Sequence, residues 1–485
     1  MVVNSLAFLW FFLIVLVIYY LCQQKKELQN MFLLLSSYWF YSQIDIKMTL
    51  LLVILTLVFW LLGRGVAYYL DKEDEKRAAI VTNIGVVIGI GALFYFKYLN
   101  FFAESVVSFA SLLGIHLSWT ALHLVVPVGL SFFTFKLMSY VLDIYNGKIL
   151  PEKNAISFAN FIAFFPTILS GPIDRPKPFL KQVNQVRLFN PDNFLIGFRR
   201  VLWGMFLKMC IADRLDIYVS AIFKNYEHHS TISIIFASLL YPLQMYADFG
   251  GYSEMAIGVA LILGFQVAEN FKRPFFSTDI SEYWRRWHIS LTSWLTDYIF
   301  LPLNIKFRRF GIQGTMLAII INMLFVGLWH GANWTFFVFG LYHGSLFIPL
   351  LLSGHLNKKK EIKNRTNICS FFVLVTKIAS TYFLVTIGQF IFRAPSLSDA
   401  YAIIFHSFNS WNGNLFYDMP TLINAIICLT VLFYVDIKEE WFTPKGANQL
   451  RWTKPYQVDL ILCLEIICIL LFGVFDNNQF IYFQF

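Results

Sequence analysis

Residues 281–298 read S-E-Y-W-R-R-W-H-I-S-L-T-S-W-L-T-D-Y, and after an apolar run residues 326–334 read V-G-L-W-H-G-A-N-W. Each stretch places a histidine, His288 or His330, among tryptophans. An ionisable group at bilayer depth costs about 2.5 kcal/mol or more, so it is a functional candidate by default and its partner is expected nearby. A short helix, a turn and one membrane span would bring the two imidazoles together. The pair therefore marks the predicted site.

The composition around these stretches is that of a polytopic, all-α membrane protein. Hydrophobic residues make up 58% of the chain and charged residues 14%, against about 25% charged in an average soluble domain. The 53 Phe, 24 Tyr and 13 Trp suit a lipid-facing surface with aromatic belts. The net charge of +9 comes from Lys and Arg in short loops between spans, where such residues set orientation. We therefore predict membrane lipids, and no nucleic acid, as partners.

Apolar runs recur along the whole chain. Met1 to Leu21 has no basic n-region and no cleavage site, so it is read as a retained first span. The chain is predicted to be one integral-membrane domain over 1–485, with N-terminal spans in 1–150, a core with re-entrant segments and the histidine site in 151–345, and C-terminal spans in 346–485. About 11 transmembrane helices are expected, the later ones at about 48–63, 79–97, 100–115, 121–143, 231–246, 250–265, 313–330, 334–352, 370–392, 421–436 and 457–474.

Residues 164–180 read F-F-P-T-I-L-S-G-P-I-D-R-P-K-P-F-L and cannot form one continuous helix, because each of four prolines removes a backbone donor. Irregular backbone at membrane depth needs shielding by protein or a water-filled cavity. We predict a re-entrant or funnel-lining element over 157–180, with Asp174 and Arg175 at its aqueous mouth. An ordinary cytoplasmic loop is the alternative. Basic residues beside aromatic ones next predict a helix in the interface, at Arg199, Arg200 and Lys208.

Residues 246–254 read Y-A-D-F-G-G-Y-S-E, between two predicted spans. Gly250 and Gly251 allow a break in the helix or a close backbone approach. Asp248 is expected to point inward. It either orients a histidine or pairs with an arginine such as Arg273 or Arg286, and the sequence leaves that choice open.

The two histidines suit proton transfer. On a helix His330 would share a side with Asn333 and Trp334, and its flanking glycines would let another chain or a slender ligand approach the ring. His288 would share a helical face with Trp284. A neutral imidazole accepts a proton from a hydroxyl or thiol and returns it, as acyl transfer from a thioester to an alcohol requires. A structural role in a packed bundle is the competing interpretation, and His343 is the further histidine to test.

No His, Cys or Asp spacing in the sequence matches a metal site, so none is predicted. The six cysteines lie in or beside apolar runs without C-x-x-C spacing, which is typical of small buried side chains.

Six motifs resemble the membrane-bound O-acyltransferase (MBOAT) family, above all its bacterial alginate O-acetyltransferase-type branch. They are S-E-Y-W-R-R-W-H-I-S-L-T, G-L-W-H-G-A-N-W, Y-A-D-F-G-G-Y-S-E-M-A-I-G, P-V-G-L-S-F-F-T-F at 127–135, F-F-P-T-I-L-S-G-P-I-D-R and Q-F-I-Y-F-Q-F at 479–485. The match runs in order over most of the chain.

The resemblance implies roughly eleven spans around a central tunnel, with the acyl donor entering from the cytoplasm. It places the family's near-invariant catalytic histidine at His330 and a second, more variable polar position at His288, which reacts or orients. The resemblance also implies tunnel or substrate candidates, namely Asp248, Tyr252, Asp174, Arg175, Arg286, Trp329 and Asn333.

The resemblance further implies acetyl-CoA as the donor substrate, without a bound cofactor, and O-acetylation of an exported, alginate-like polysaccharide or of peptidoglycan. An extracytoplasmic acetyltransferase is the expected partner, and the bacterial inner membrane the expected location of this multi-pass protein. D-alanyl transfer to teichoic acid is the alternative within the family. A transporter and a non-catalytic scaffold are the alternatives of another class, although the missing internal repeat argues against a transporter.

Overall fold

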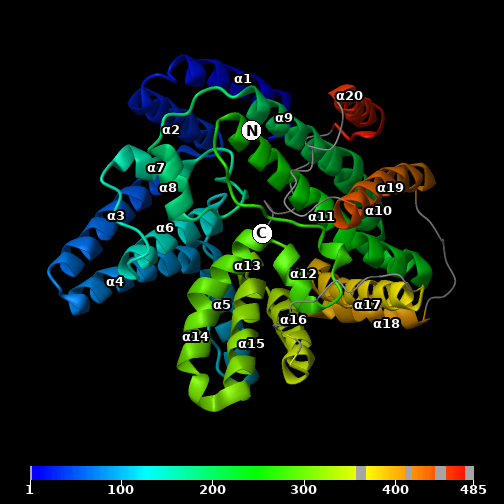
Figure 1. The fold of residues 1–485 in the computed structure, drawn as a ribbon. Coiled ribbons are helices and arrows are strands. Elements are labelled where there is room, and N and C mark those ends of the chain that lie inside the picture. Colours follow the sequence, from blue (N-terminus) through cyan, green and yellow to red (C-terminus); the bar gives the residue numbers. More distant parts are fainter. Residues whose placement is uncertain (1–2, 355, 357–367, 410–417, 443–454, 476–485) are drawn as a thin grey trace. The chain divides into compact units, whose positions relative to one another are not determined.

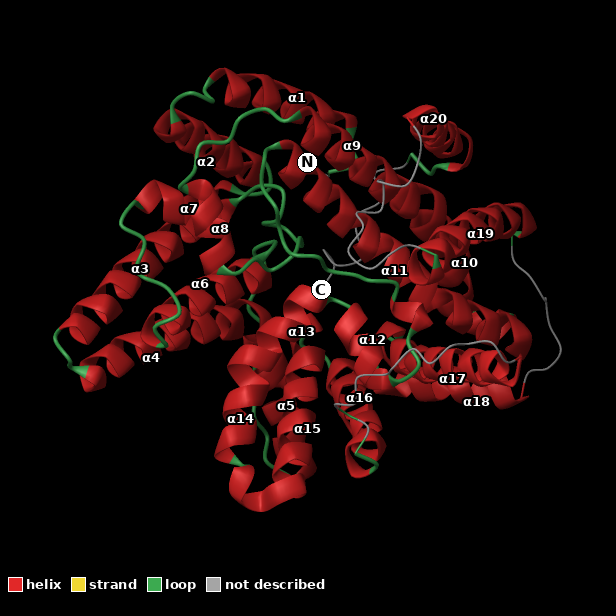
Figure 2. Cartoon of the chain, viewed as in Figure 1, coloured by secondary structure: helices red, strands yellow, loops and turns green. Residues whose placement is uncertain are grey.

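A computed structural model describes residues 3–354, 356, 368–409, 418–442 and 455–475. Every regular element in those residues is a helix, as the cartoon shows (Figure 2), so the predicted all-α class is confirmed. The motif at 479–485 lies outside the described residues.

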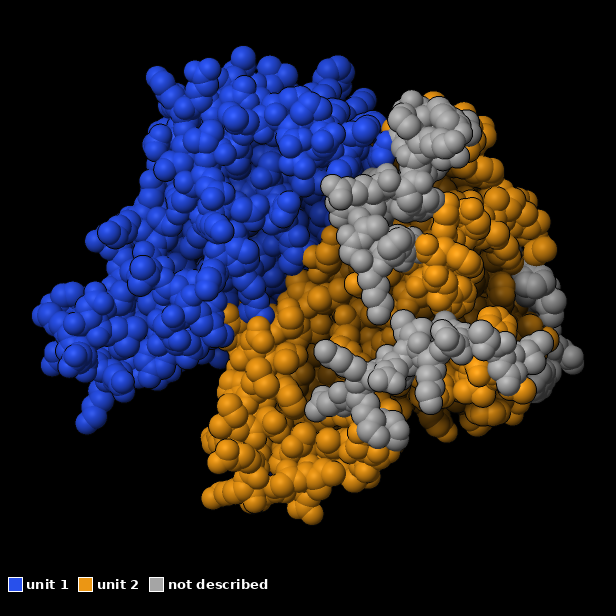
Figure 3. Space-filling model, in the orientation of Figure 1, with its two compact units in different colours: residues 1–201, 256–268 blue, residues 202–255, 269–485 orange. Residues whose placement is uncertain are grey.

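The chain divides into two compact units, coloured separately in Figure 3. One comprises residues 1–201 and 256–268, and the other 202–255 and 269–485. The division falls inside helices α9 and α11, and the predicted single domain stays a prediction. The helices up to that first boundary are α1 (Leu6–Leu21), α2 (Lys26–Ser42), α3 (Ile46–Asp71), α4 (Glu75–Leu93), the π-helix η1 (Phe94–Tyr98), α5 (Leu99–Leu112), α6 (Leu130–Tyr145), α7 (Ala155–Ala163), α8 (Pro176–Val183) and α9 (Pro191–Met205).

The remaining helices are labelled in Figure 1 where room allows. They are η2 (Phe206–Ala212), α10 (Asp213–Lys224), η3 (Tyr226–His228), α11 (Thr231–Ile262), η4 (Pro274–Phe276), α12 (Ile280–Arg286), α13 (Ile289–Leu295), η5 (Thr296–Phe300), α14 (Leu301–Lys306), η6 (Arg308–Phe310), α15 (Gly311–His330), α16 (Trp334–Leu352), α17 (Ile368–Arg393), α18 (Leu397–Asn409), α19 (Met419–Trp441) and α20 (Pro455–Phe472).

Among the described residues, seven helices are long and apolar enough to cross a membrane. They are Ile46–Asp71, Glu75–Leu112, Thr231–Ile262, Arg308–His330, Trp334–Leu352, Cys369–Arg393 and Met419–Trp441, and shorter apolar helices lie at Leu6–Leu21 and Leu462–Phe472. The multi-pass architecture is therefore confirmed. Two predicted pairs of spans, 79–97 with 100–115 and 231–246 with 250–265, are each one continuous helical run.

The glycines of α11 explain the second of these corrections. A Cβ at Gly251 would lie 2.7 Å from the carbonyl oxygen of Gly204, and a Cβ at Gly204 would lie 2.5 Å from that of Gly251. Each glycine therefore lets the other helix approach to backbone contact. Of the two roles open to Gly250 and Gly251, Gly251 serves the close approach, and α11 does not break.

The proline-rich segment interrupts the helices as predicted. Helix α7 ends at Ala163 and α8 begins at Pro176, the position in a helix where proline's missing N–H is harmless. The residues between them are buried, except Arg175, which is partly exposed. Asp174 is only 4% exposed, and its Oδ1 accepts a hydrogen bond from the Ala268 N–H at 2.9 Å. Asp174 was predicted at an aqueous mouth, but it is buried. Its carboxylate accepts a hydrogen bond from the backbone of its own compact unit.

Helices α15 and α16 form an antiparallel hairpin that carries one of the two histidines. A Cβ at Gly327 would lie 2.1 Å from the Phe336 carbonyl oxygen, and a Cβ at Gly340 would lie 2.5 Å from that of Met323. The predicted space beside His330 is thus occupied, at Gly327 by the backbone of α16 and at Gly331 by the Phe336 ring.

Candidate active site

His288 lies between two short helices rather than on one. Helix α12 is capped by Asp279, whose carboxylate accepts from the Glu282 N–H, and ends at Arg286. Helix α13 begins at Ile289, and His288 has a φ of 45°, in the left-handed region. The predicted helical face shared with Trp284 is therefore wrong, because the backbone turns at the histidine. A histidine in this conformation is uncommon and points to a constraint on where its ring must lie.

The Asn270 side chain fixes the tautomer of His288. Asn270 Oδ1 accepts a hydrogen bond from Ser290 Oγ at 2.9 Å and lies 3.0 Å from His288 Nδ1. The amide is oriented by its Nδ2, which donates to Ser253 Oγ at 3.0 Å. Because an amide oxygen only accepts, Nδ1 of His288 carries the proton, and the lone pair of the neutral ring is on Nε2.

Trp329 lies between the two predicted histidines. Its ring centroid is 5.3 Å from that of His288 and 5.1 Å from that of His330, both edge to face. The imidazoles are 1% and 4% exposed. The expectation that the two histidines come near each other is confirmed, with the Trp329 indole against both rings.

Aromatic side chains enclose His330. The Phe392 ring centroid lies 5.0 Å from the imidazole and that of Phe339 lies 6.1 Å away. Helix α15 ends at His330, and Asn333 caps α16 by accepting from the Thr335 N–H at 3.0 Å. The predicted shared side of His330 with Asn333 and Trp334 is therefore wrong, because the helix ends between them. Asn333 also donates to the Pro395 carbonyl at 2.8 Å. Its side chain therefore caps α16 and joins the start of that helix to the segment at Pro395.

Burial lowers the pKa of the His288 imidazole to about 3, so this ring is neutral at pH 7. A base works best when its pKa lies near the working pH. His288 is thus better suited to accept a hydrogen bond through Nε2 than to store a proton. This bears on the open question of its role and favours orientation over reaction.

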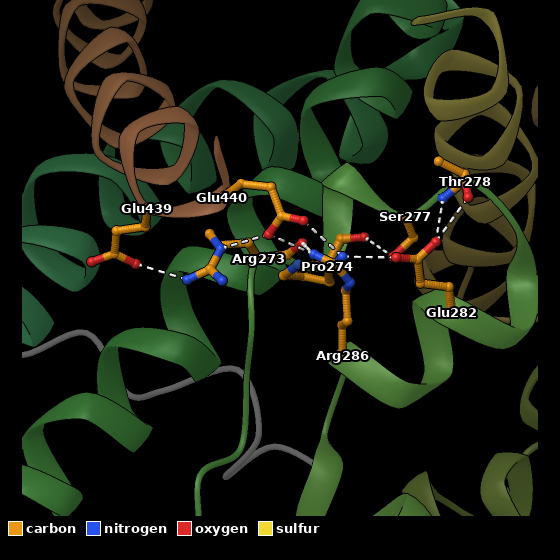
Figure 4. A network of polar contacts seen from close by, with 8 residues as sticks. All are labelled: Arg273, Pro274, Ser277, Thr278, Glu282, Arg286, Glu439 and Glu440. Atoms are coloured by element: carbon orange, nitrogen blue, oxygen red, sulfur yellow. Dashed lines mark hydrogen bonds and ion pairs between the residues drawn. The ribbon is translucent and has the colours of Figure 1, made fainter. Parts of the chain in front are cut away.

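Arg286 belongs to a network of ion pairs, shown from close by in Figure 4. It binds Glu440 of α19 and Glu282 of its own helix. Arg273 binds Glu440 and Glu439. Both arginines that the sequence offered to Asp248 therefore pair with glutamates.

Asp248 pairs with Lys208, a partner that the sequence analysis did not name. Lys208 Nζ lies 2.6 Å from Asp248 Oδ1 and 2.9 Å from Asp213 Oδ1. Lys208 is 1% exposed, within the π-helix η2, so its predicted place on an interfacial helix is wrong. The inward direction of Asp248 is confirmed, and Tyr252, one turn further along α11, is also 1% exposed.

His343 occupies a second buried position close to these residues. Its Nδ1 accepts a hydrogen bond from Trp284 Nε1 at 3.3 Å, and its ring lies 4.6 Å from that of Phe339, centroid to centroid. Phe339 thus contacts both His330 and His343.

The structure brings His288, Trp329 and His330 together and places Arg286 two residues before His288. Asp174 and Arg175 belong to the other compact unit. Sequence reasoning missed Asn270, Asp213 and Glu440. Each lies next to other charged residues, within 269–273, 213–216 and 438–440, so its type and its neighbours did not single it out. Within the described ranges, no group of three His, Cys, Asp or Glu residues is arranged to hold a metal ion.

Comparison with known proteins adds independent findings. A family model described as MBOAT, membrane-bound O-acyltransferase family, matches residues 150–392. That range contains His288, Trp329 and His330, and it ends before Glu439 and Glu440.

Named relatives extend the similarity to the whole chain. A Pseudomonas putida protein named Probable alginate O-acetylase AlgI is 34% identical, covering 100% of both chains. A Helicobacter pylori protein named Peptidoglycan O-acetyltransferase is 27% identical over 94% of this chain and 91% of its own. A Bacillus subtilis protein named Teichoic acid D-alanyltransferase is 28% identical over 55% of this chain and 68% of its own.

Proposed function

The chain belongs to the membrane-bound O-acyltransferase family and is a multi-pass membrane O-acyltransferase, and we propose that it takes acetyl groups from cytoplasmic acetyl-CoA for O-acetylation of an exported polysaccharide or of peptidoglycan. The single observation that carries the chemistry is the pair of buried imidazoles, His288 and His330, against one indole. We propose the bacterial inner membrane as its location.

We assign His330 the role of general base. The acceptor hydroxyl oxygen attacks the carbonyl carbon of the thioester, and His330 takes the hydroxyl proton. The carbon–sulfur bond then breaks, and the proton passes from His330 to the departing thiolate, so CoA leaves as the thiol. A positioned general base typically contributes about 10²–10⁴ in rate. His288, neutral and with its lone pair on Nε2, orients the hydroxyl or the thiol by accepting a hydrogen bond.

The aromatic enclosure of His330 suits this step. Phe339, Phe392 and Trp329 surround the ring with apolar surface. Electrostatic interactions are stronger where water is excluded, and the thioester is protected there from hydrolysis. An acetyl group is small and apolar enough for such surroundings.

Because the final acceptor is a polymer outside the cytoplasm, we propose a partner protein on that side of the membrane. An extracytoplasmic acetyltransferase receives the acetyl group and passes it to the polymer, as the resemblance implies. The support for acetyl over D-alanyl transfer is the extent of similarity, because the relative named for D-alanyl transfer covers 55% of this chain and the one named for alginate acetylation covers all of it.

The test is growth with labelled acetate, followed by assay of envelope polymers for base-labile acetyl esters. His330→Ala should reduce the ester to background. Purified His330→Ala, given acetyl-CoA and an acceptor oligosaccharide, should no longer release CoA. His123→Ala is the matched control, since His123 is exposed and lies in the other compact unit.

Undiminished acetyl ester in the His330→Ala cells would refute this role of His330. Base-labile alanine in place of acetate would indicate D-alanyl transfer. Purified protein that never consumes a thioester would favour a scaffold.

A further inference from the structure

The C-terminal end of helix α19 binds the segment that carries His288. Glu440 Oε2 accepts from Arg273 Nε at 2.9 Å and from Arg286 Nη1 at 2.9 Å. Its other oxygen, Oε1, accepts from Arg286 Nη2 at 2.8 Å. One carboxylate thus joins Arg273, which precedes helix α12, to Arg286, the last residue of that helix (Figure 4).

The contact with Arg286 is the bidentate fork that carboxylates and guanidinium groups form best. The side chains of Arg286 and Glu440 are 17% and 18% exposed. This limited exposure makes the pair stronger than an ion pair at an open surface. Glu282 accepts from the same Nη2 at 2.7 Å, and its other oxygen accepts from the Thr278 N–H and hydroxyl, so Arg286 is held from two helices.

The backbone on either side of α12 is also joined directly. The Lys272 N–H donates to the Arg286 carbonyl at 2.9 Å, and the Ile289 N–H donates to the Asn270 carbonyl at 2.8 Å. Residues 270–273 and 286–289 therefore run side by side, with His288 on one segment and Asn270, which fixes its tautomer, on the other. Glu440 bridges one end of this pairing.

Both segments hold a residue in the left-handed region. Arg273 has a φ of 46° and His288 a φ of 45°. Such conformations are unfavourable for residues with a side chain and persist only where surrounding contacts enforce them. The Glu440 bridge, together with the two backbone hydrogen bonds, supplies contacts of that kind.

We propose that Glu440 is a positioning residue that acts through Arg273 and Arg286 to hold the His288 imidazole against Trp329. This inference rests on the proposed acyl transfer and goes beyond it, because it assigns a role in the site to a helix that carries neither histidine. The family model ends at residue 392, before α19, so the match does not cover this residue.

The test compares purified Glu440→Gln with Glu439→Gln, using release of CoA from acetyl-CoA in the presence of a hexuronate oligosaccharide as acceptor. Glu440→Gln keeps the shape of the side chain and removes the charge that joins both arginines, so kcat should fall by about 10-fold to 100-fold, as expected for a misplaced catalytic group. The KM for acetyl-CoA should change by less than about twofold, because its binding is not altered. Glu439 contacts Arg273 at 3.0 Å and does not join it to Arg286, so the kcat of Glu439→Gln should stay within about threefold of that of the unaltered protein.

A second comparison separates positioning from general stability. In a His288→Ala background, Glu440→Gln should cost no further activity, because two changes that act on one group are not additive. If Glu440→Gln does not fold, Arg286→Lys replaces it, since lysine keeps the charge but cannot form the fork. If His288→Ala leaves no measurable rate, a structure of the Glu440→Gln variant takes its place, and loss of the Asn270–His288 contact is the expected result.

Unchanged kcat in folded Glu440→Gln, or the same loss with and without His288, would overturn the inference, as would an unchanged His288 in the variant structure. The proposed function itself fails on a different observation. It fails if the unaltered protein does not consume the thioester, or if His330→Ala consumes it as fast as the unaltered protein does.

Discussion

The side-chain oxygen of Asn270 decides what the His288 ring can do. A carboxylate in the same place would stabilise the imidazolium form, as in triads with an acidic member. The neutral amide holds the ring in one tautomer without favouring its protonation. His288 therefore offers a lone pair at Nε2 in a ring that stays neutral, and a proton acceptor has to be sought elsewhere, which is why His330 is assigned that role.

We predict that Asn270→Ala lowers kcat by about 10-fold to 100-fold, because loss of one hydrogen bond to a buried group costs about 1–3 kcal/mol. The change frees the His288 ring and leaves its Nδ1–H without this acceptor. The measurement is CoA release by the purified variant at saturating acetyl-CoA.

The control for Asn270 is Ser293→Ala on helix α13. The Ser293 hydroxyl donates to the Ser290 carbonyl at 3.1 Å and to no atom of Asn270 or His288 among the described contacts. The kcat of Ser293→Ala should stay within about twofold of that of the unaltered protein, since a local side-chain hydrogen bond of this kind contributes little free energy. Equal losses of kcat in the two variants would show that the contact between Asn270 and His288 contributes no more to the reaction than the local bond of Ser293.

Sequence reasoning found the histidines but not the residues that hold them. His288 and His330 were identifiable because each is an ionisable residue among tryptophans. Asn270 lies in an irregular stretch with no periodicity, and its contact with His288 depends on how residues 270–273 run beside 286–289. Such a pairing between a loop and the junction of two short helices leaves no pattern in a single sequence.

At the scale of helices, α16 and α17 approach each other where His343 meets Gly388. A Cβ at Gly388 would lie 2.3 Å from His343 Nε2, so only glycine fits against this ring. Gly388→Ala should lower the stability by about 1–3 kcal/mol, the usual cost of overpacking a core. Thermal unfolding of the purified protein in detergent measures the change.

His343→Ala opens the space that the new methyl group needs. The double variant should therefore be more stable than the sum of the two single losses predicts, as contacting residues couple. Gly91→Ala is the control, because nothing lies within 4 Å of a Cβ at that position and alanine favours the helix. Strict additivity of the two losses would argue against contact between His343 and Gly388.

Prolines were more informative than glycines about where helices end. The prolines of 164–180 marked an interruption that the structure contains between Ala163 and Pro176, because a missing donor acts locally. Gly250 and Gly251 were compatible with either a break or a close approach. The neighbouring backbone of Gly204 decides between them, and that neighbour is 47 positions away in the chain.

For the whole molecule, hydrophobic composition was sufficient to predict a multi-pass helical protein, while the number of spans depended on junctions. Helix α4 continues through the π-helix η1 into α5, so two predicted spans form one run over Glu75–Leu112. A π-helical turn needs no proline or glycine, and hydropathy alone divides such a run wherever a polar residue such as Lys97 intervenes.

The charge of acetyl-CoA leads to a prediction about the membrane as a whole. Its phosphates would each cost several kcal/mol or more at the bilayer centre, so the donor has to remain on one side. An acetyl group alone is small and uncharged. We therefore expect that, in vesicles holding the purified protein in one orientation, CoA is released on the side where acetyl-CoA is added, and labelled acetyl accumulates on the other.

The measurement uses labelled acetyl-CoA outside the vesicles and a hexuronate oligosaccharide trapped inside, with protease protection reporting the orientation. Label should appear in the lumen as ester or acetate and should fall to the background of empty vesicles with His330→Ala. Label that remains outside as product, with the thioester consumed, would mean that transfer occurs on the donor's own side. The acyl group would then not cross the membrane through this protein, although His330 could still catalyse its transfer.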